Sequence, residues 1–73
     1  MSEVAAIGEP FLVGGFALAG VHVYPAESPD QARAAWLALP TGIDVVILSP
    51  AAAGALGGER TAPHARLSVV MPG

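Results

Sequence analysis

Short apolar runs recur along the chain, each bounded by glycine, proline or polar residues. Four of them are too short for helices and rich in branched or aromatic side chains, which predicts β-strands. They cover residues 4–7, 21–24, 43–48 and 66–71. The run at 43–48 is almost continuously apolar, as expected of a strand that is covered on both faces.

A helical pattern follows the second of these runs. Ser28 is a typical capping residue, Pro29 suits the first helical position, and Gln31 completes a capping box. Apolar residues then recur at i, i+3, i+4 and i+7, namely Ala32, Ala35, Trp36 and Leu39. The pattern predicts a helix over residues 28–39 with Trp36 in the core.

Two weaker helices are predicted elsewhere. Ser49 and Pro50 repeat the serine–proline start, so residues 51–56 are expected to form two helical turns before Gly57. Residues 11–19 are predicted to form a helix closed by Gly20, although the glycines at 14 and 15 lower its propensity. We expect only burial of its large side chains to hold that helix, namely Phe11, Leu12, Phe16 and Leu18.

Strands and helices therefore alternate in the order βαβαβαβ, with a polar loop at 59–65. This order is typical of a parallel sheet with right-handed crossovers and helices on both faces. The sequence predicts one small α/β domain over residues 1–73. Its four-stranded sheet is expected to be flavodoxin-like or receiver-like, in the strand order 2-1-3-4.

Composition excludes several classes of protein. The 73 residues include no cysteine and no lysine, only three arginines, and carry a formal net charge of −3. A chain of this charge gains nothing from counterion release, so we expect no nucleic-acid binding. The 17-residue uncharged run at 10–26 is interrupted by glycines and flanked by prolines, so no membrane insertion is expected either.

The residues that carry chemistry are few. The segment 15–20 has the glycine spacing of a phosphate-binding loop but lacks the lysine, and residue 49, a serine, stands where a receiver domain needs an aspartate. His22 is expected on a partly exposed strand position and His64 in the polar loop. Ser28 and Ser49 are better explained as helix caps than as nucleophiles. We expect no catalytic residue, no metal site and no cofactor.

The two carboxylates nearest the strand ends do not form a catalytic pair either. Glu9 follows the first strand and Asp44 begins the third, so the parallel order predicts them at opposite ends of neighbouring strands. The sequence thus favours a protein that is not an enzyme.

A family resemblance supplies a function. Residues 15–21 read GFALAGV and resemble the G-F-R-L-A-G-V stretch of the F subunit of the V-type and A-type rotary ATPases. Three further segments resemble the same family in the same order. They are IGE at 7–9, DVVIL at 44–48 and VVMPG at 69–73, and the helix at 28–39 falls at the family's second helix.

The resemblance implies a non-catalytic subunit of the central rotor stalk, bound to the D subunit that forms the coiled-coil shaft and to other stalk subunits. It implies a cytoplasmic protein, peripheral to the membrane. Three departures are visible. Ala17 replaces the family's usual arginine, Gly57 and Gly58 shorten the third helix, and the family's C-terminal helix is absent after Gly73.

The expected partner surface lies along one edge of the sheet. The strand at 21–24 is an edge strand with only Pro25 to block further pairing, and an unprotected edge invites a partner. We therefore expect the contact at Phe16, Ala17, Leu18 and Tyr24, unless Phe16 and Leu18 fill the core. The alternative function is a repurposed regulatory or assembly domain that self-associates as a homodimer.

Overall fold

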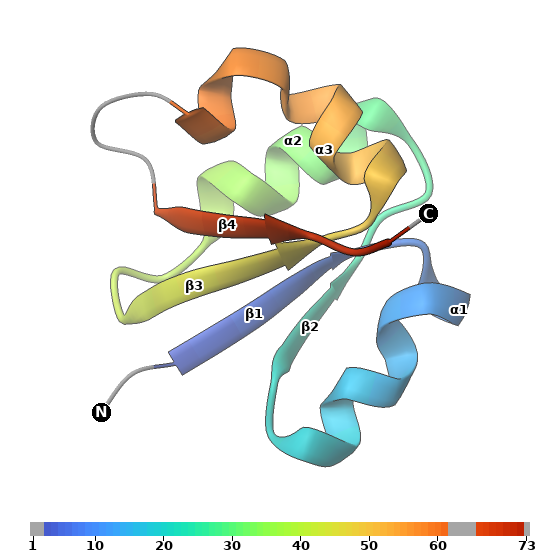
Figure 1. Ribbon diagram of the computed structural model, residues 1–73, viewed down its shortest axis with the longest axis vertical. Coiled ribbons are helices and arrows are strands. Elements are labelled where there is room, and N and C mark those ends of the chain that lie inside the picture. The colour runs from blue at the N-terminus through green and yellow to red at the C-terminus, as the bar shows by residue number, and fades with distance from the viewer. Residues whose placement is uncertain (1–2, 62–65, 73) are drawn as a thin grey trace.

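The chain forms a four-stranded, all-parallel sheet with helices on both faces (Figure 1). The computed structural model describes residues 3–61 and 66–72. The strand order is β2-β1-β3-β4, which confirms the predicted 2-1-3-4 arrangement. The strands are β1 (Glu3–Gly8), β2 (His22–Pro25), β3 (Ile43–Leu48) and β4 (Leu67–Val70).

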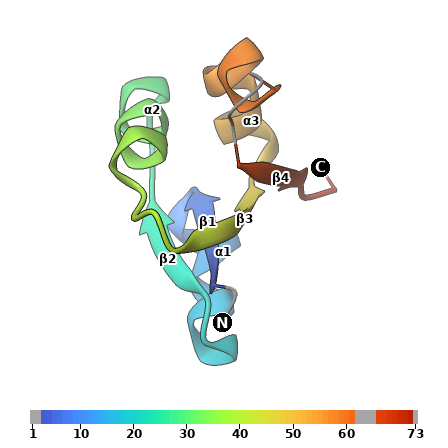
Figure 2. The same ribbon diagram turned by 90° about the vertical axis from the view of Figure 1, so that its left-hand side faces the viewer.

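Two helices cover one face of the sheet and one helical segment covers part of the other (Figure 2). On the first face lie α2 (Pro29–Ala38) and α3 (Pro50–Leu56), which pack against each other and on β1. On the second lie α1 (Pro10–Val13) and the 3-10 helix η1 (Gly14–Ala19), which pack on β1 and β2. The predicted α/β class is confirmed.

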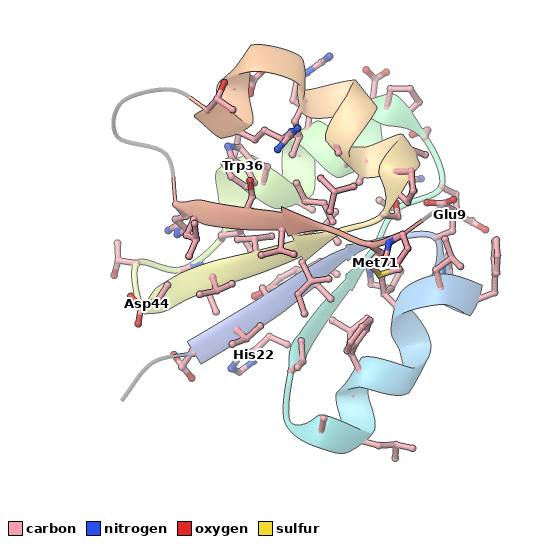
Figure 3. The ribbon with its side chains drawn as sticks, viewed as in Figure 1. Glu9, His22, Trp36, Asp44 and Met71 are labelled. Atoms are coloured by element: carbon pink, nitrogen blue, oxygen red, sulfur yellow. The ribbon has the colours of Figure 1, made fainter. Side chains whose placement is uncertain are left out.

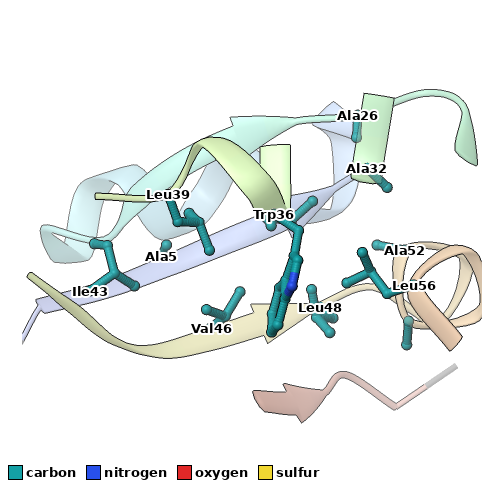
Figure 4. Packing of buried hydrophobic residues seen from close by; sticks show 12 residues of the cluster. Ala5, Ala26, Ala32, Trp36, Leu39, Ile43, Val46, Leu48, Ala52 and Leu56 are labelled. Carbon is teal, nitrogen blue, oxygen red and sulfur yellow. The ribbon is translucent and has the colours of Figure 1, made fainter. Parts of the chain in front are cut away.

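The main core lies between the sheet and the α2–α3 layer (Figure 4). Trp36 of α2 reaches down to the sheet, where Val46 and Leu48 of β3 are fully buried. Ile7 of β1 is equally buried beside them. The predicted apolar face of α2 is confirmed, because Ala32, Trp36 and Leu39 all belong to this core.

The serine caps of α2 and α3 form as their sequences predict, but the Gln31 side chain accepts from the Glu27 amide and not from the Ser28 amide that a capping box uses. The Ser28 hydroxyl accepts a hydrogen bond from the Gln31 amide at 3.1 Å, and the Gln31 side chain accepts one from the Glu27 amide at 2.7 Å. The Ser49 hydroxyl accepts from the Ala52 amide at 3.2 Å. Each cap satisfies an amide that the first helical turn leaves without a partner.

The expected helix over residues 11–19 is correct in its extent and in its closure by Gly20, but wrong in its type after Val13. The α-helix lasts four residues, and a 3-10 helix takes over from Gly14 to Ala19, where two successive glycines weaken the α-helical turn. The expected anchors are wrong as well, since Phe11, Leu12 and Leu18 are exposed. The side chain that α1 buries completely is Val13.

The last third of the chain differs from the prediction in two places. Residues 57–61, expected in part as a polar loop, form the 3-10 helix η2 (Gly57–Thr61). The fourth strand, Leu67–Val70, is shorter than the predicted 66–71, and the Arg66 side chain lies against the α2–β3 connection. Its guanidinium donates to the carbonyl oxygens of Ile43, Leu39 and Pro40 at 2.9, 3.1 and 2.7 Å. His64 and Gly73 lie outside the described residues.

The third strand is only half covered. Val46 and Leu48 are buried beneath α2 and α3, but Val45 and Ile47, which point to the other face, are half-buried. The expectation that both faces of this strand are covered is therefore correct for one face and wrong for the other.

Candidate partner interface

The segment GFALAGV forms a surface turn. Gly20 adopts φ 81°, a left-handed conformation that favours glycine, and its amide donates to the Ala17 carbonyl at 3.2 Å. The Val21 amide donates to the Phe16 carbonyl at 3.3 Å and leads the chain into β2. This closed turn presents Leu18 with 95% of its surface exposed.

The other residues of the expected interface are less accessible. Ala17 is exposed beside Leu18, while Phe16 is half-buried. The interpretation of Leu18 as a core residue is therefore wrong. The Phe16 side chain is partly buried in the protein and partly exposed to solvent. An exposed leucine next to an exposed alanine gives η1 a small apolar surface without any charge.

Tyr24 does not share a face with η1. It pairs in register with Ile7, and register partners in a parallel sheet point to the same side. Its half-buried ring accordingly packs against the main core, on the side of α2. A partner that touches Leu18 and Tyr24 together has to reach around the edge of β2.

The carboxyl ends of the strands hold the most structured polar group. Ser49 is fully buried, and its hydroxyl donates to the Glu9 carboxylate at 2.7 Å while it accepts from the Ala52 amide. Its hydrogen and one lone pair are thus engaged, which supports the interpretation as a cap rather than a nucleophile. Figure 3 shows Glu9 and Asp44 at opposite ends of the sheet, as expected.

A hollow of about 170 Å³ lies beside Glu9, between the starts of α2 and α3. Its lining is mostly apolar and includes the methyl groups of four alanines, while its polar residues are Glu9, Glu27 and Ser28. Pockets for small ligands usually measure roughly 300–1,000 Å³ and contain several convergent polar groups. This hollow, at the usual ligand position of an open α/β sheet, is small and offers few polar groups.

The remaining polar contacts are structural. His22 is half-exposed, as expected, and its Nε2 lies 3.0 Å from a carboxylate oxygen of Glu3 on the neighbouring strand. Arg33 of α2 donates to the Ala55 carbonyl at 3.1 Å and so ties α2 to α3. Within residues 3–61 and 66–72, no three histidine, aspartate or glutamate side chains come together as a metal site.

Two further observations concern membrane-spanning helices and the similarity of this chain to known proteins. No helix among the described residues is both long and apolar enough to cross a bilayer. Comparisons with known protein families, with curated proteins and with solved structures find no match to this chain.

The sequence interpretation missed one exposed apolar surface. Val45 and Ile47 of β3 lie in register with Leu67 and Val69 of β4, and these four side chains share the face of the sheet that α1 covers only in part. We call them the β3–β4 patch. The alternation at 67–70 would have revealed that Leu67 and Val69 share one face, but not that this face lacks a covering helix.

Proposed function

We propose that this chain is a non-catalytic central-stalk subunit of a V/A-type proton- or sodium-translocating rotary ATPase. In this role it binds the coiled-coil shaft, which the D subunit forms, and neighbouring stalk subunits on the cytoplasmic side of the membrane. The proposal combines the resemblance of four segments to the F subunit with the exposed apolar side chains of α1 and η1.

The observation that carries the proposal is the position of the segment that resembles the family most. GFALAGV forms η1 and its closing turn, and it holds Leu18 at 95% exposure instead of burying it. An isolated leucine on a surface is ordinary, but Phe11 of the adjoining α1 is also 82% exposed. Exposed apolar side chains on one helical segment favour a protein contact.

The charge pattern agrees with a coiled-coil partner. No aspartate, glutamate, lysine or arginine occurs between Pro10 and Ala26, so η1 presents an uncharged surface to the partner. Coiled-coil shafts expose long side chains such as lysine and glutamate, whose methylene groups pack on apolar surface while the charged ends stay in water.

Co-expression with the candidate shaft protein tests the proposal. The two proteins should co-elute in size-exclusion chromatography at micromolar concentration, and Ala17→Glu or Leu18→Asp should weaken the complex at least tenfold. Both residues are exposed, so the melting temperature should change by only a few degrees. Tyr24→Arg is a poorer probe, because the Tyr24 ring packs on the core.

Leu37→Asp is the matched control. Leu37 is 73% exposed on α2, on the other side of the sheet, so its variant should bind the shaft like the parent. Separate elution of the two unmodified proteins contradicts the stalk role. Full binding by both η1 variants places the interface elsewhere.

A further inference from the structure

The β3–β4 patch is an apolar surface on the face of the sheet that α1 and η1 cover only in part. The register pairs Val45 with Leu67 and Ile47 with Val69, so the four side chains form a two-by-two group. Leu67 is 66% exposed and Val69 51% exposed. On this side of the sheet α1 and η1 pack on β1 and β2, and the described residues place no helix over β4 (Figure 2).

The dimensions of the patch fit one helix. Neighbouring strands lie roughly 4.8 Å apart, so two strands with their side chains offer a strip about 10 Å wide. A helix with side chains is about 10–12 Å in diameter. The opposite face has the same ratio of one helix to two strands, since α2 and α3 together cover the four-stranded sheet. The four residues of β4 span about 13 Å, the length of two to three helical turns.

A second copy of the chain fits the patch less well. A stable interface buries about 800 Å² on each partner. That footprint is about a fifth of the 4319 Å² of accessible surface of this small domain. Four partly exposed side chains offer less than the area that a stable dimer buries. A short helix lying along the strip has a smaller footprint than a second copy of the domain.

The charges around the patch indicate which charge a partner should carry. Arg66, which comes directly before β4, donates its N–H groups to three carbonyl oxygens of the protein. Arg33 lies between α2 and α3, where it pairs with Asp30 and Glu59. Asp44, which precedes Val45 in β3, is exposed, and the chain carries a net charge of −3. Lysine or arginine beside the apolar stripe of a partner therefore complements this surface, and acidic residues oppose it.

We infer that the β3–β4 patch binds one amphipathic helix of a protein partner, with an apolar stripe flanked by basic residues. The helix lies along the strip beside α1 and completes the second helical layer of the sheet. The inference concerns β3 and β4, so it does not depend on the proposed contact of the shaft with η1 and the edge of β2.

A designed peptide tests the inference without knowledge of the natural partner. The probe is an 18-residue helix with leucines at i, i+3, i+4 and i+7 and lysines beside them, added to the isotope-labelled full chain. Amide chemical shifts in the NMR spectrum should change at residues 45–47 and 67–71, and saturate at peptide concentrations on the order of 100 μM. A peptide with glutamates in place of the lysines should bind at least tenfold more weakly.

Variants of the protein provide the second half of the test. Val69→Lys should weaken binding of the lysine peptide at least tenfold. If this variant does not fold, Leu67→Ser replaces it and should weaken binding of the same peptide severalfold. Leu37→Lys, on the opposite layer, should bind within twofold of the parent. The same variants should leave binding to the shaft unchanged, which separates this inference from the stalk proposal.

Three results overturn the inference. The first is the absence of saturable shift changes at the patch. The second is unchanged binding by both patch variants, or shift changes confined to η1 and β2. The third is a dimer of the unmodified chain in light scattering that Val69→Lys converts to monomer, which makes a second copy the occupant.

Discussion

The two faces of the sheet differ in how completely they are packed. Beneath α2 and α3 a continuous core includes Trp36 and the buried side chains of β1 and β3. On the other face Ala6 and Val13 are fully buried, while Phe11 and Leu18 point into solvent. The described residues complete one core, whereas the second face leaves several large apolar side chains exposed to solvent.

The helices explain the difference. The ten-residue α2 begins with a serine cap and carries an apolar stripe that buries Ala32 and Trp36 in the main core. The four-residue α1 passes into a 3-10 helix at Gly14, and its large side chains do not share one face. Packing on the first face therefore provides most of the folding free energy, and substitutions on the two faces should differ sharply.

The largest effect is expected at Trp36, the only tryptophan of the chain. Trp36→Ala removes the largest core side chain and should lower the free energy of unfolding by about 3–5 kcal/mol. A domain of this size has a total of roughly 4–11 kcal/mol, so the variant should be largely or partly unfolded. Urea denaturation followed by circular dichroism measures the loss. The neighbouring Leu37→Ala, on the exposed side of α2, should change it by less than about 0.5 kcal/mol; equal losses would refute the assignment of the core.

An intermediate effect is expected at Gly8, where the two helical layers approach each other. A Cβ atom at Gly8 would lie 2.7 Å from the Cβ and Oγ atoms of Ser49 and 3.1 Å from a methyl carbon of Val13. Gly8→Ala should therefore cost about 1–3 kcal/mol through overpacking.

Gly14→Ala is the matched control for Gly8. Gly14 has a helical φ of −55° and no heavy atom within 4 Å of an added Cβ. This change should raise stability by about 0.4–1 kcal/mol, since it restricts the unfolded chain. Thermal denaturation of both variants gives the comparison, and stabilisation by Gly8→Ala would show that the junction is looser than described.

The smallest effect is expected at the β3–β4 patch. Val69→Thr replaces a half-exposed methyl group with a hydroxyl that water can reach, so the free energy of unfolding should change by less than about 0.5 kcal/mol. Val46→Thr makes the same change at a fully buried position of β3, and should cost about 1–3 kcal/mol. Urea titrations of the pair measure the contrast between the faces directly, and equal costs would contradict it.

The sequence predicted the parts of this fold that local chemistry determines. The serine–proline starts of α2 and α3, the apolar stripe around Trp36 and the alternation of strands and helices each have a short-range cause. Together they gave the parallel sheet and its strand order. The caps at Ser28 and Ser49 were also predicted correctly.

The first helical segment and the exposed surfaces could not be predicted in the same way. Whether Phe11 and Leu18 are buried depends on how far α1 extends before Gly14 and Gly15, and on what lies opposite each side chain. The β3–β4 patch depends on the number of helices over each face, a tertiary property. The face on which Tyr24 lies could not be predicted either, because strand register decides which way its side chain points.

The contacts of Arg66 determine from which end β4 can open locally. Within residues 3–61 and 66–72 this strand pairs with β3 alone, and Leu67, Val69 and Val70 all keep exposed surface, so little packing opposes its local opening. Its first residues are held by the Arg66 side chain, whereas its far end depends on the bond from the Met71 amide to the Leu48 carbonyl. Opening should begin at Met71 and stop near Arg66, and native-state hydrogen exchange would show it as faster exchange in β4 than in β1. A helix bound across β3 and β4 should slow that exchange, so that occupancy of the patch and the local stability of the last strand rise together.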